Sequence, residues 1–437
     1  MDDLTKAIDE TMADLEKLIS IQSVSSQTEH ELDVRATADV IANALTEIGA
    51  ADVSVVVEGG APAVIAHFPA PEGQPTVCLY AHHDVQPVLP EHDWTSPAFT
   101  AEVRDGRLYG RGSADDKGGV AVHLAALRAF DGKPPVGVTV FIEGEEEVGS
   151  PSLGKIIERH HDALSSDAFV IADAMNWEVG VPGLTNTLRG VVDCVVEVAT
   201  LAHGVHSGEY GGAVPDALTT LCRLLATLHD EEGNVAIAGL QAGKAAELDY
   251  PVDRLAKETG LLPGVNQIGS GNIVDRLWTK PACSVIALDT TRIADASNTL
   301  IPKASAKVSL RVAPGDDAER ALAALREHLL ANAPWGAQVS VTDGQTGQPG
   351  IVEAGEFTET MRVALAESFE VEPVFLGCGG SIPMVADFQE AFPGAEVLIT
   401  AVTDPGSRIH GIDESLDLGD WRKSAKAEAL FLEKLAR

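Results

Sequence analysis

Acidic residues and histidines gather at five places along the chain, and four of these places directly follow an apolar run. The five clusters are His82-His83-Asp84, Asp115-Asp116, Glu145-Glu146-Glu147, Asp173, and Asp404 with His410. Carboxylates packed closely repel one another and raise each other's pKa unless a cation lies among them. Imidazole nitrogens and carboxylate oxygens form the mixed ligand set that zinc, cobalt and manganese accept. These residue types therefore indicate a metal centre, provided that the fold brings the clusters together.

Each cluster taken alone has an ordinary structural explanation. A histidine after a strand is usually a satisfied polar residue, and an aspartate pair before a helix usually caps its first N–H groups. The stretch "EGEEE" at 143–147 could equally be a solvated edge. It is the five clusters in combination that favour a metal site over these explanations.

The elements that would position the clusters follow from the apolar pattern. An amphipathic helix is predicted at the start of the chain, because apolar residues recur at helical spacing from Leu4 to Leu18. Strands are predicted at 53–57, 63–68, 76–81, 136–142 and 168–172, and helices after Gly118-Gly119 and near 152–161. Near-continuous apolar strands that alternate with helices are typical of an α/β sheet covered on both faces. Such sheets place their ligand crevices at the carboxyl ends of the strands, where four of the clusters lie.

A different pattern begins after about residue 187. Strands are predicted at 191–200, 283–288, 304–312 and 337–343, and helices at 215–229 and 316–330. This β-α-β-β-α-β order is that of a ferredoxin-like sandwich, with residues 230–282 as an insertion. From about residue 345 the α/β pattern resumes, with a strand at 396–402 and a final helix near 418–436. We therefore predict an α/β catalytic domain formed by residues 1–187 and 345–437, interrupted by an α+β lid at 188–344.

Five stretches resemble, in their order, the motifs of a known enzyme superfamily. They are "LYAHHDVQP", "LYGRGSADDKGG", "EGEEEVGS", "VIADAMNW" and "SRIHGIDES". They are similar to the motifs of the di-zinc dipeptidases, aminoacylases and glutamate carboxypeptidases, and carnosinase-type cytosolic dipeptidases are the closest likeness. In the lid, "HSGEYGG" and "NTLIPKASAKVSLRV" also resemble family blocks. The resemblance covers almost the whole chain and implies a mixed-sheet α/β/α catalytic domain with a ferredoxin-like lid that also serves for dimerisation.

The resemblance implies a centre of two divalent metal ions per subunit, zinc in the first place, with manganese or cobalt as alternatives. Asp115 would bridge the two ions. His82 and Asp173 would complete the ligands of one ion. Glu147 and His410 would complete those of the other.

The residues next to these ligands receive roles from the same resemblance. Glu146 would be the general base, and Asp84 would hydrogen-bond the ring N–H of His82 and so fix its tautomer. The peptide between Asp115 and Asp116 resembles one that is cis in this family. Glu145 receives no role and is expected to be solvated or to lie behind the ligands.

The lid would contribute substrate contacts. His206 matches a histidine that family members contribute across a dimer interface, where it would stabilise the oxyanion; His203 is a lesser candidate. Arg311, in an otherwise apolar strand, is expected to clamp a substrate carboxylate, with a salt bridge inside the lid as the alternative. The remaining expected substrate contacts are Asn298, Thr299, Gly380 and Ser381.

Composition restricts the partners and the location. The chain has 66 acidic and 31 basic residues and a formal charge of −35, which repels phosphate backbones and anionic membrane surfaces. Nucleic acid and membranes are therefore not expected as partners. Five scattered cysteines without a C-x-x-C pair argue against a disulfide framework. The acidic start "MDDLTKAIDE" does not resemble a secretory signal, so we expect a cytoplasmic protein.

The resulting hypothesis is metal-dependent hydrolysis of the amide bond in dipeptides or small peptides with a free C-terminal carboxylate, in a homodimer formed through the lid. An N-acyl-amino-acid deacylase or a glutamate carboxypeptidase is the alternative within the same chemistry. A metal-binding protein without catalysis is disfavoured, because all five ligands, Glu146 and Asp84 are present. Calcium-dependent adhesion is disfavoured as well, because the chain has no D-x-D-x-D-G loop.

Overall fold

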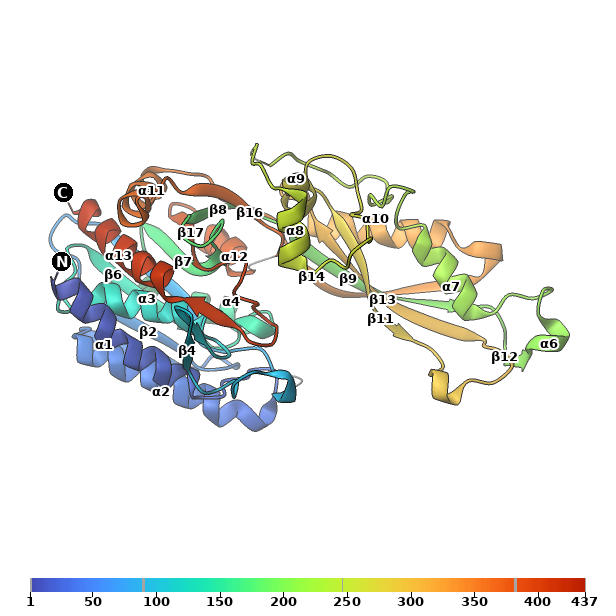
Figure 1. Cartoon of the computed structure of the whole chain (residues 1–437), viewed down its shortest axis with the longest axis horizontal. Helices are drawn as coiled ribbons and strands as arrows, with labels where there is room; N and C mark the ends of the chain where they lie inside the picture. The colour runs from blue at the N-terminus through green and yellow to red at the C-terminus, as the bar shows by residue number, and fades with distance from the viewer. Residues whose placement is uncertain (1, 89–90, 246, 381–382, 437) are drawn as a thin grey trace. The chain divides into compact units, whose positions relative to one another are not determined.

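The chain divides into two compact units. The computed structural model describes residues 2–88, 91–245, 247–380 and 383–436. The first unit comprises Met1–Asn186, Val352–Leu376 and Pro383–Arg437, and the second comprises Thr187–Ile351 and Gly377–Ile382 (Figure 1). The second unit therefore extends beyond the predicted 188–344 and includes a short segment from the C-terminal part of the chain.

A mixed sheet forms the centre of the first unit. In the described residues it has nine strands in the order β1-β2-β6-β3-β7-β17-β8-β15, with β16 beside β8. Strands β6, β3, β7 and β17 run parallel, and the pairs β1–β2, β2–β6, β17–β8 and β8–β15 are antiparallel. The strands are β1 (Asp52–Val56), β2 (Ala63–Phe68), β3 (Thr76–His82), β6 (Gly137–Glu143), β7 (Ala168–Met175), β8 (Gly183–Leu188), β15 (Gly350–Ile351), β16 (Val374–Cys378) and β17 (Glu396–Thr403). The predicted mixed sheet is confirmed.

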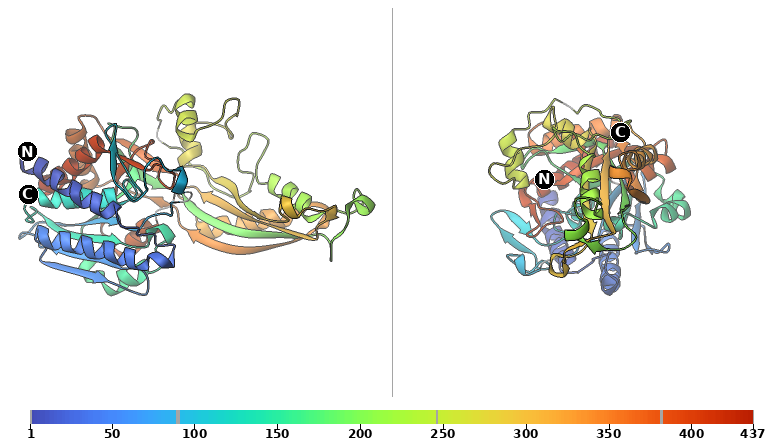
Figure 2. Two further views of the ribbon diagram at one scale, coloured as in Figure 1. Left: turned by 60° about the horizontal axis from the view of Figure 1, so that its bottom comes forward. Right: turned by 90° about the vertical axis from the view of Figure 1, so that its right-hand side faces the viewer.

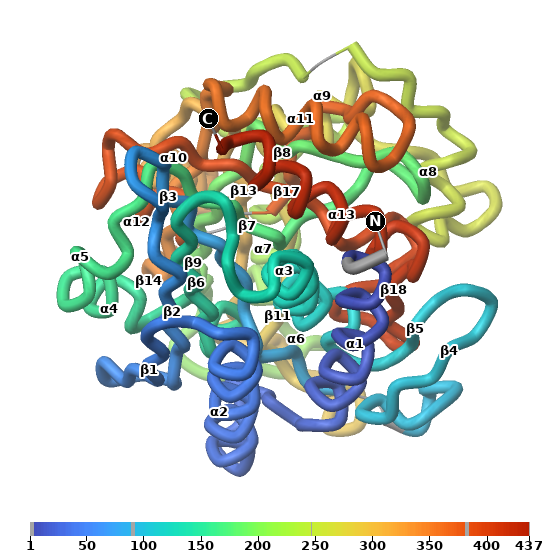
Figure 3. Tube along the Cα trace, turned by 90° about the vertical axis from the view of Figure 1, so that its left-hand side faces the viewer, coloured from blue at the N-terminus to red at the C-terminus, as the bar shows by residue number. Residues whose placement is uncertain are grey.

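Helices cover both faces of this sheet (Figure 3). One layer contains α1 (Asp2–Ile19), α2 (Glu31–Ile48), α3 (Lys117–Arg128), α11 (Glu356–Phe369) and α13 (Leu418–Leu435). The other contains α4 (Leu153–Arg159), α5 (His161–Leu164) and α12 (Pro383–Ala391). Side chains of β3 alternate between the layers: Val77 and Leu79 join the core under the first layer, and Tyr80 packs against Phe141 and Phe388 on the other side. Burial on both faces explains why these strands are almost continuously apolar.

The second unit is the predicted ferredoxin-like sandwich. Its sheet has the order β11-β13-β9-β14 with antiparallel pairs throughout, and α7 and α10 pack along it (Figure 2). The elements are β9 (Gly190–Ala199), α7 (Ala217–Ala226), β11 (Ala282–Asp289), β13 (Lys303–Val312), α10 (Ala318–Ala331) and β14 (Gln338–Gly347). Alternate residues of β13 are buried, the pattern of a strand with one face on the core. The β-α-β-β-α-β order is confirmed.

Shorter elements complete both units. The first unit also holds the small sheet of β4 (Glu102–Arg104), β5 (Arg107–Tyr109) and β18 (Ser415–Asp417). The second holds the β10 (Val205–His206) and β12 (Thr299–Leu300) pair, α6 (Ser207–Tyr210), α8 (Val252–Thr259) and α9 (Ile273–Trp278). Among the described residues, no helix combines the length and the apolar character that crossing a bilayer requires. The five cysteines, all among the described residues, are free thiols.

The main segment of the second unit, Thr187–Ile351, begins and ends in two neighbouring strands. Strand β8 leads into it and β15 leads out of it, and these strands pair directly, with Leu188 opposite Gly350 and Thr187 opposite Ile351.

Candidate metal centre and active site

The carboxyl ends of the parallel strands of the first unit carry the predicted metal ligands. His82 is the last residue of β3, and Glu147 lies in the turn Glu146–Val148 that follows β6. Asp173 lies near the end of β7, and His410 follows β17. Asp115 comes from the loop before α3. Because these strands run in parallel, residues far apart in sequence meet at one edge of the sheet.

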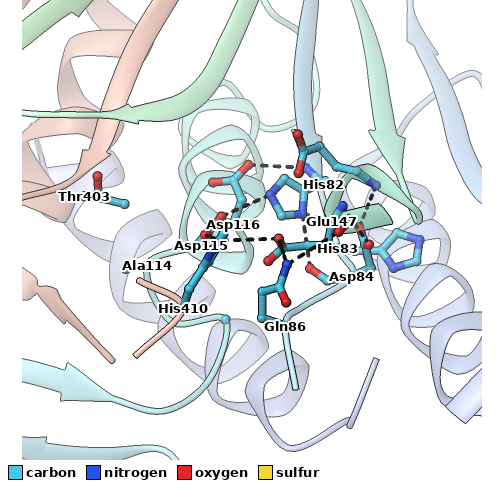
Figure 4. A network of polar contacts seen from close by, with 12 residues as sticks. His82, His83, Asp84, Gln86, Ala114, Asp115, Asp116, Glu147, Thr403 and His410 are labelled. Atoms are coloured by element: carbon cyan, nitrogen blue, oxygen red, sulfur yellow. Dashed lines mark hydrogen bonds and ion pairs between the residues drawn. The ribbon is translucent and has the colours of Figure 1, made fainter. Parts of the chain in front are cut away.

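Two groups of three potential ligands form at this edge. His82, Asp116 and Asp173 make up one group, and Asp115, Glu147 and His410 make up the other; within each group the ligand atoms lie within 4.8 Å of one another. Asp115 connects the groups, with Oδ1 3.1 Å from Nε2 of His82 and Oδ2 3.0 Å from Nε2 of His410 (Figure 4). Nε2 of His410 also lies 3.3 Å from Oε2 of Glu147.

Asp116 is the member of these groups that sequence reasoning did not select. Its side chain makes no capping hydrogen bond to α3, although it occupies the N-cap position. Instead, Oδ2 of Asp116 accepts the backbone N–H of His82 at 3.2 Å. The peptide between Asp115 and Asp116 is cis, as the resemblance implied. Asp116 therefore supports the end of β3 in addition to standing at the N-terminus of α3.

Asp84 holds the backbone of the glutamate turn. Its carboxylate accepts the N–H of Glu146 through Oδ1 and the N–H of Glu147 through Oδ2, both at 3.1 Å. It also accepts the hydroxyl of Ser25 at 2.6 Å. The ring Nδ1 of His82 lies 3.1 Å from the carbonyl oxygen of Asp84 and 3.4 Å from its Oδ1. The expected contact with the His82 ring is therefore made first by the main chain, and the buried carboxylate mainly orients the turn.

Glu145 is buried, not solvated. Its carboxylate accepts the N–H of Ala61 at 2.8 Å and the N–H of Ser152 at 2.6 Å. A Cβ atom at Gly60 would clash with the carboxylate of Glu145, so the close approach of this carboxylate favours glycine. Glu145 thus supports the turn from behind.

Two further residues fix the ligands and were not selected from the sequence. Nε2 of Gln86 donates to Oε2 of Glu147 at 2.7 Å. The fully buried Glu414 accepts the N–H groups of Gly112, Ala114 and Asp115 at 3.0–3.1 Å and pairs with Arg111 at 2.7 Å. The signal for Gln86 lies in the motif "HHDVQP", but nothing local to Glu414 indicates that it holds the Asp115 loop.

The buried carboxylates of this cluster need a positive charge nearby to stay ionised. Burial raises the pKa of Asp173 well above its usual range, and the charges of Asp115, Asp116 and Glu147 raise it further. Burial also raises the pKa of Glu146, as do neighbouring carboxylates. Hydrogen bonds to Asp115 and Glu147 raise the pKa of His410 to about 10.

The residues present fit divalent metal ions. Within the described chain, Asp173 makes no hydrogen bond or ion pair, and Oδ1 of Asp116 has no hydrogen-bond partner although it is buried. Unpaired buried carboxylate oxygens are costly unless a cation or donor satisfies them. Each group offers one imidazole and two carboxylates, which suits zinc and related ions.

The residues expected to touch substrate lie in the second unit. His206 in β10 pairs with Thr299 in β12, and the carbonyl of Asn298 accepts the N–H of Ser207 at 2.9 Å. Nδ1 of His206 accepts the N–H of Gly208 at 3.1 Å, which leaves the proton of a neutral ring on the exposed Nε2. The structure thus brings His206, Asn298 and Thr299 together on one loop region. His203 is exposed nearby in sequence and lies outside this pair of strands.

Arg311 lies in β13, opposite Val191 of β9 and Ala282 of β11. It forms no ion pair with any described residue, and its expected role in binding a carboxylate stays a prediction. The backbone N–H of Gly380 lies 3.4 Å from the sulfur of Cys378. Ser381 falls outside the described residues.

Comparison with known proteins agrees with this geometry. Residues 78–434 match the sequence model of Peptidase family M20/M25/M40. The cysteinylglycine-S-conjugate dipeptidase of Corynebacterium striatum is 35% identical, and the match covers 98% of this chain and 96% of the relative. The Cys-Gly metallodipeptidase dug1 of Schizosaccharomyces pombe is 26% identical over 99% of this chain and 97% of its own. The structure of human carnosine dipeptidase 1 aligns with a TM-score of 0.85 at 23% identity, covering 99% of this chain and 97% of that one.

These comparisons confirm the predicted resemblance, and the Beta-Ala-His dipeptidase of Homo sapiens, a carnosinase-type relative, is 27% identical over 86% of this chain and 78% of its own. Because the family match spans most of the chain and includes every residue of the two ligand groups, this chain belongs to Peptidase family M20/M25/M40.

Proposed function

We propose that the protein hydrolyses the peptide bond of dipeptides with a free C-terminal carboxylate, in a reaction that depends on two divalent metal ions, zinc in the first place. Family membership makes it a metal-dependent hydrolase, and the relatives named above are dipeptidases. Their names favour dipeptides over N-acyl amino acids or glutamate-terminated substrates. The observation that carries the proposal is the pair of ligand groups joined by Asp115 beside the unliganded carboxylate of Glu146.

The ligands would divide between the two ions largely along the two groups, with Asp115 shared because its two oxygens lie next to His82 and His410. His82 and Asp173 would hold one ion, Glu147 and His410 the other, and Asp115 both. Asp116 lies close enough to assist the first ion. When bound, such ions acidify a water molecule and polarise the substrate carbonyl.

Glu146 would act as the general base. Its side chain makes no hydrogen bond within the described chain, and its backbone N–H is fixed by Asp84. A carboxylate in this position takes the proton of the attacking water and returns it to the leaving amine. Because Asp84 holds the turn through its main chain, both oxygens of the Glu146 carboxylate stay available for proton transfer.

His206 would stabilise the oxyanion. Because Nδ1 accepts a backbone N–H, Nε2 carries the proton and can donate to a developing negative charge. Asn298 and Thr299, next to it, would contact the substrate, as would Gly380 and Ser381. Arg311 would bind the substrate carboxylate, since a guanidinium matches that group with two parallel hydrogen bonds.

A homodimer through the second unit is part of the proposal. Strand β11 lies at the edge of its sheet and exposes Val285, Ile286 and Leu288 at 41%, 57% and 52%. An apolar edge strand left open invites pairing with another chain, and a second copy offers the same edge. Sedimentation of the wild type and of an Ile286→Lys variant tests this: a dimer that persists unchanged in the variant contradicts the assigned surface.

The function is tested with a dipeptide panel, N-acetyl amino acids and the Glu146→Gln variant, each assayed with added zinc or manganese. We expect dipeptides to be cleaved best by the wild type. Glu146→Gln should keep its metal content and lose about 10²–10⁴-fold in turnover. Near-normal turnover of this variant removes Glu146 from the mechanism, and preference for N-acetyl amino acids replaces the dipeptidase assignment by a deacylase.

A further inference from the structure

A second arginine lies near Arg311 in the sheet of the second unit: Arg189 stands two residues before Val191, the residue of β9 that pairs with Arg311. Arg189 precedes β9, and its side chain is only 8% exposed. Within the described chain neither Arg189 nor Arg311 forms an ion pair with a carboxylate. The protein has 66 acidic residues, so carboxylates are abundant elsewhere and missing here.

Backbone carbonyls hold the Arg189 guanidinium in place. Its Nε donates to the carbonyl of Gly379 at 3.0 Å, and Nη1 lies 3.3 Å from the carbonyl oxygens of Arg276 and Lys280. The third nitrogen, Nη2, makes no hydrogen bond with the described residues. A Cβ atom at Gly379 would come within 2.9 Å of Nη2, so this nitrogen lies against the glycine segment that precedes Gly380.

This arrangement is unfavourable without an anion. Two like charges that are partly or fully withdrawn from water repel, and neutral carbonyls compensate a guanidinium only in part. Accordingly, burial together with the charge of Arg311 lowers the pKa of Arg189 to about 10. A carboxylate shared by both arginines would remove the repulsion and satisfy Nη2.

We propose that Arg189 is a second substrate-binding arginine, which contacts the terminal carboxylate of the dipeptide through Nη2 together with Arg311. This inference rests on the proposed function. It concerns the second unit alone, where Arg189, Arg311 and Gly379 all lie. The three carbonyl contacts pre-orient the guanidinium, which lowers the entropy lost when the substrate binds.

The test compares cysteinylglycine with cysteinylglycine amide as substrates of the zinc-loaded protein. In Arg189→Gln we expect kcat/KM for the dipeptide to fall about 10–100-fold, mostly through KM, with the amide changed less than about threefold. Arg189→Lys keeps the positive charge but lacks the planar guanidinium with its parallel N–H donors. It should show a smaller loss of kcat/KM for the dipeptide. Arg326→Gln, which removes an arginine of α10 paired with Asp343, is the matched control and should change neither substrate.

The outcomes separate the two proposals. If the wild type cleaves no dipeptide, the proposed function fails. If it does and both Arg189 variants match the wild type, or lose equally on dipeptide and amide, the inference about Arg189 is overturned. Thermal unfolding accompanies each assay: should Arg189→Gln fail to fold, Arg189→Lys decides, and a failure of both to fold assigns Arg189 a structural role and overturns the inference.

Discussion

The carboxylate of Asp84 offers the sharpest test of how the metal centre is organised. It is fully buried and accepts three hydrogen bonds, from the N–H groups of Glu146 and Glu147 and from the hydroxyl of Ser25. Asp84→Asn keeps the shape but replaces one acceptor oxygen by an NH2 group. In either orientation of the amide, one backbone N–H of the glutamate turn then faces another donor.

The magnitude follows from that orphaned group. Leaving one buried N–H unsatisfied costs about 1–3 kcal/mol, which is about a 5- to 150-fold change in an equilibrium constant. Because the turn carries Glu147, the cost should appear in metal binding as well as in folding. Loss of a partner behind a metal ligand lowers affinity about 10–100-fold. We therefore expect Asp84→Asn to unfold at lower denaturant concentration and to bind zinc more weakly.

The assay is calorimetric zinc titration of the metal-stripped protein, combined with denaturant unfolding. Ser25→Ala is the matched control, because it removes one hydrogen bond to the same carboxylate, at about 1 kcal/mol, and leaves both backbone contacts intact. Zinc affinity should change little in this control. Equal zinc affinity in Asp84→Asn and the wild type would refute the reasoning that the carboxylate orients the turn.

Other predictions concern the lid, the metal and pH. Replacing His206 by Ala should cut kcat about 10²–10³-fold without changing the metal content measured by elemental analysis, and an unchanged kcat contradicts its oxyanion role. Chelator treatment should abolish activity and lower the melting temperature, with zinc restoring both; retained activity after complete metal removal contradicts the proposed function. Burial would lower the pKa of His123, but the charge of Glu428 and the hydrogen bond that the His123 ring donates to its carboxylate raise the pKa instead. The stability that this pair contributes should be complete below the unfolded pKa of about 6.5 and should decline as the pH rises through the folded pKa. In denaturant unfolding, His123→Gln should therefore destabilise the protein more at pH 5.5 than at pH 8.5. Equal destabilisation at both pH values contradicts the raised pKa.

Strands were the most predictable elements. β3, β6 and β7 are buried on both faces, so each appears in the sequence as an apolar run that ends in a polar cluster. Helix α2 is absent from the prediction, although its buried residues Val34, Ala38, Ile41 and Leu45 recur at helical spacing. Helix α3 begins at Lys117, so the glycines expected before it lie in its first turn.

Within the site, residue types at strand ends pointed to the cluster, whereas its supporting contacts stayed hidden. The hydrogen bonds from Glu146 and Glu147 to Asp84 join residues 62 and 63 positions apart, and no local spacing encodes them. The same holds for Glu414, which lies about 300 residues from the loop it holds. Such partners follow only from the register of the parallel strands and the path of the loops between them.

The direct pairing of β8 with β15 has a consequence for the architecture of the chain. Since Thr187 lies opposite Ile351, the point of departure and the point of return are one strand spacing apart, about 4.8 Å. More than a third of the chain thus connects two adjacent strands of the sheet in the first unit, as the turn of a hairpin does. The intervening segment can therefore lengthen, shorten or change its sequence without altering the frame that holds the metal ligands.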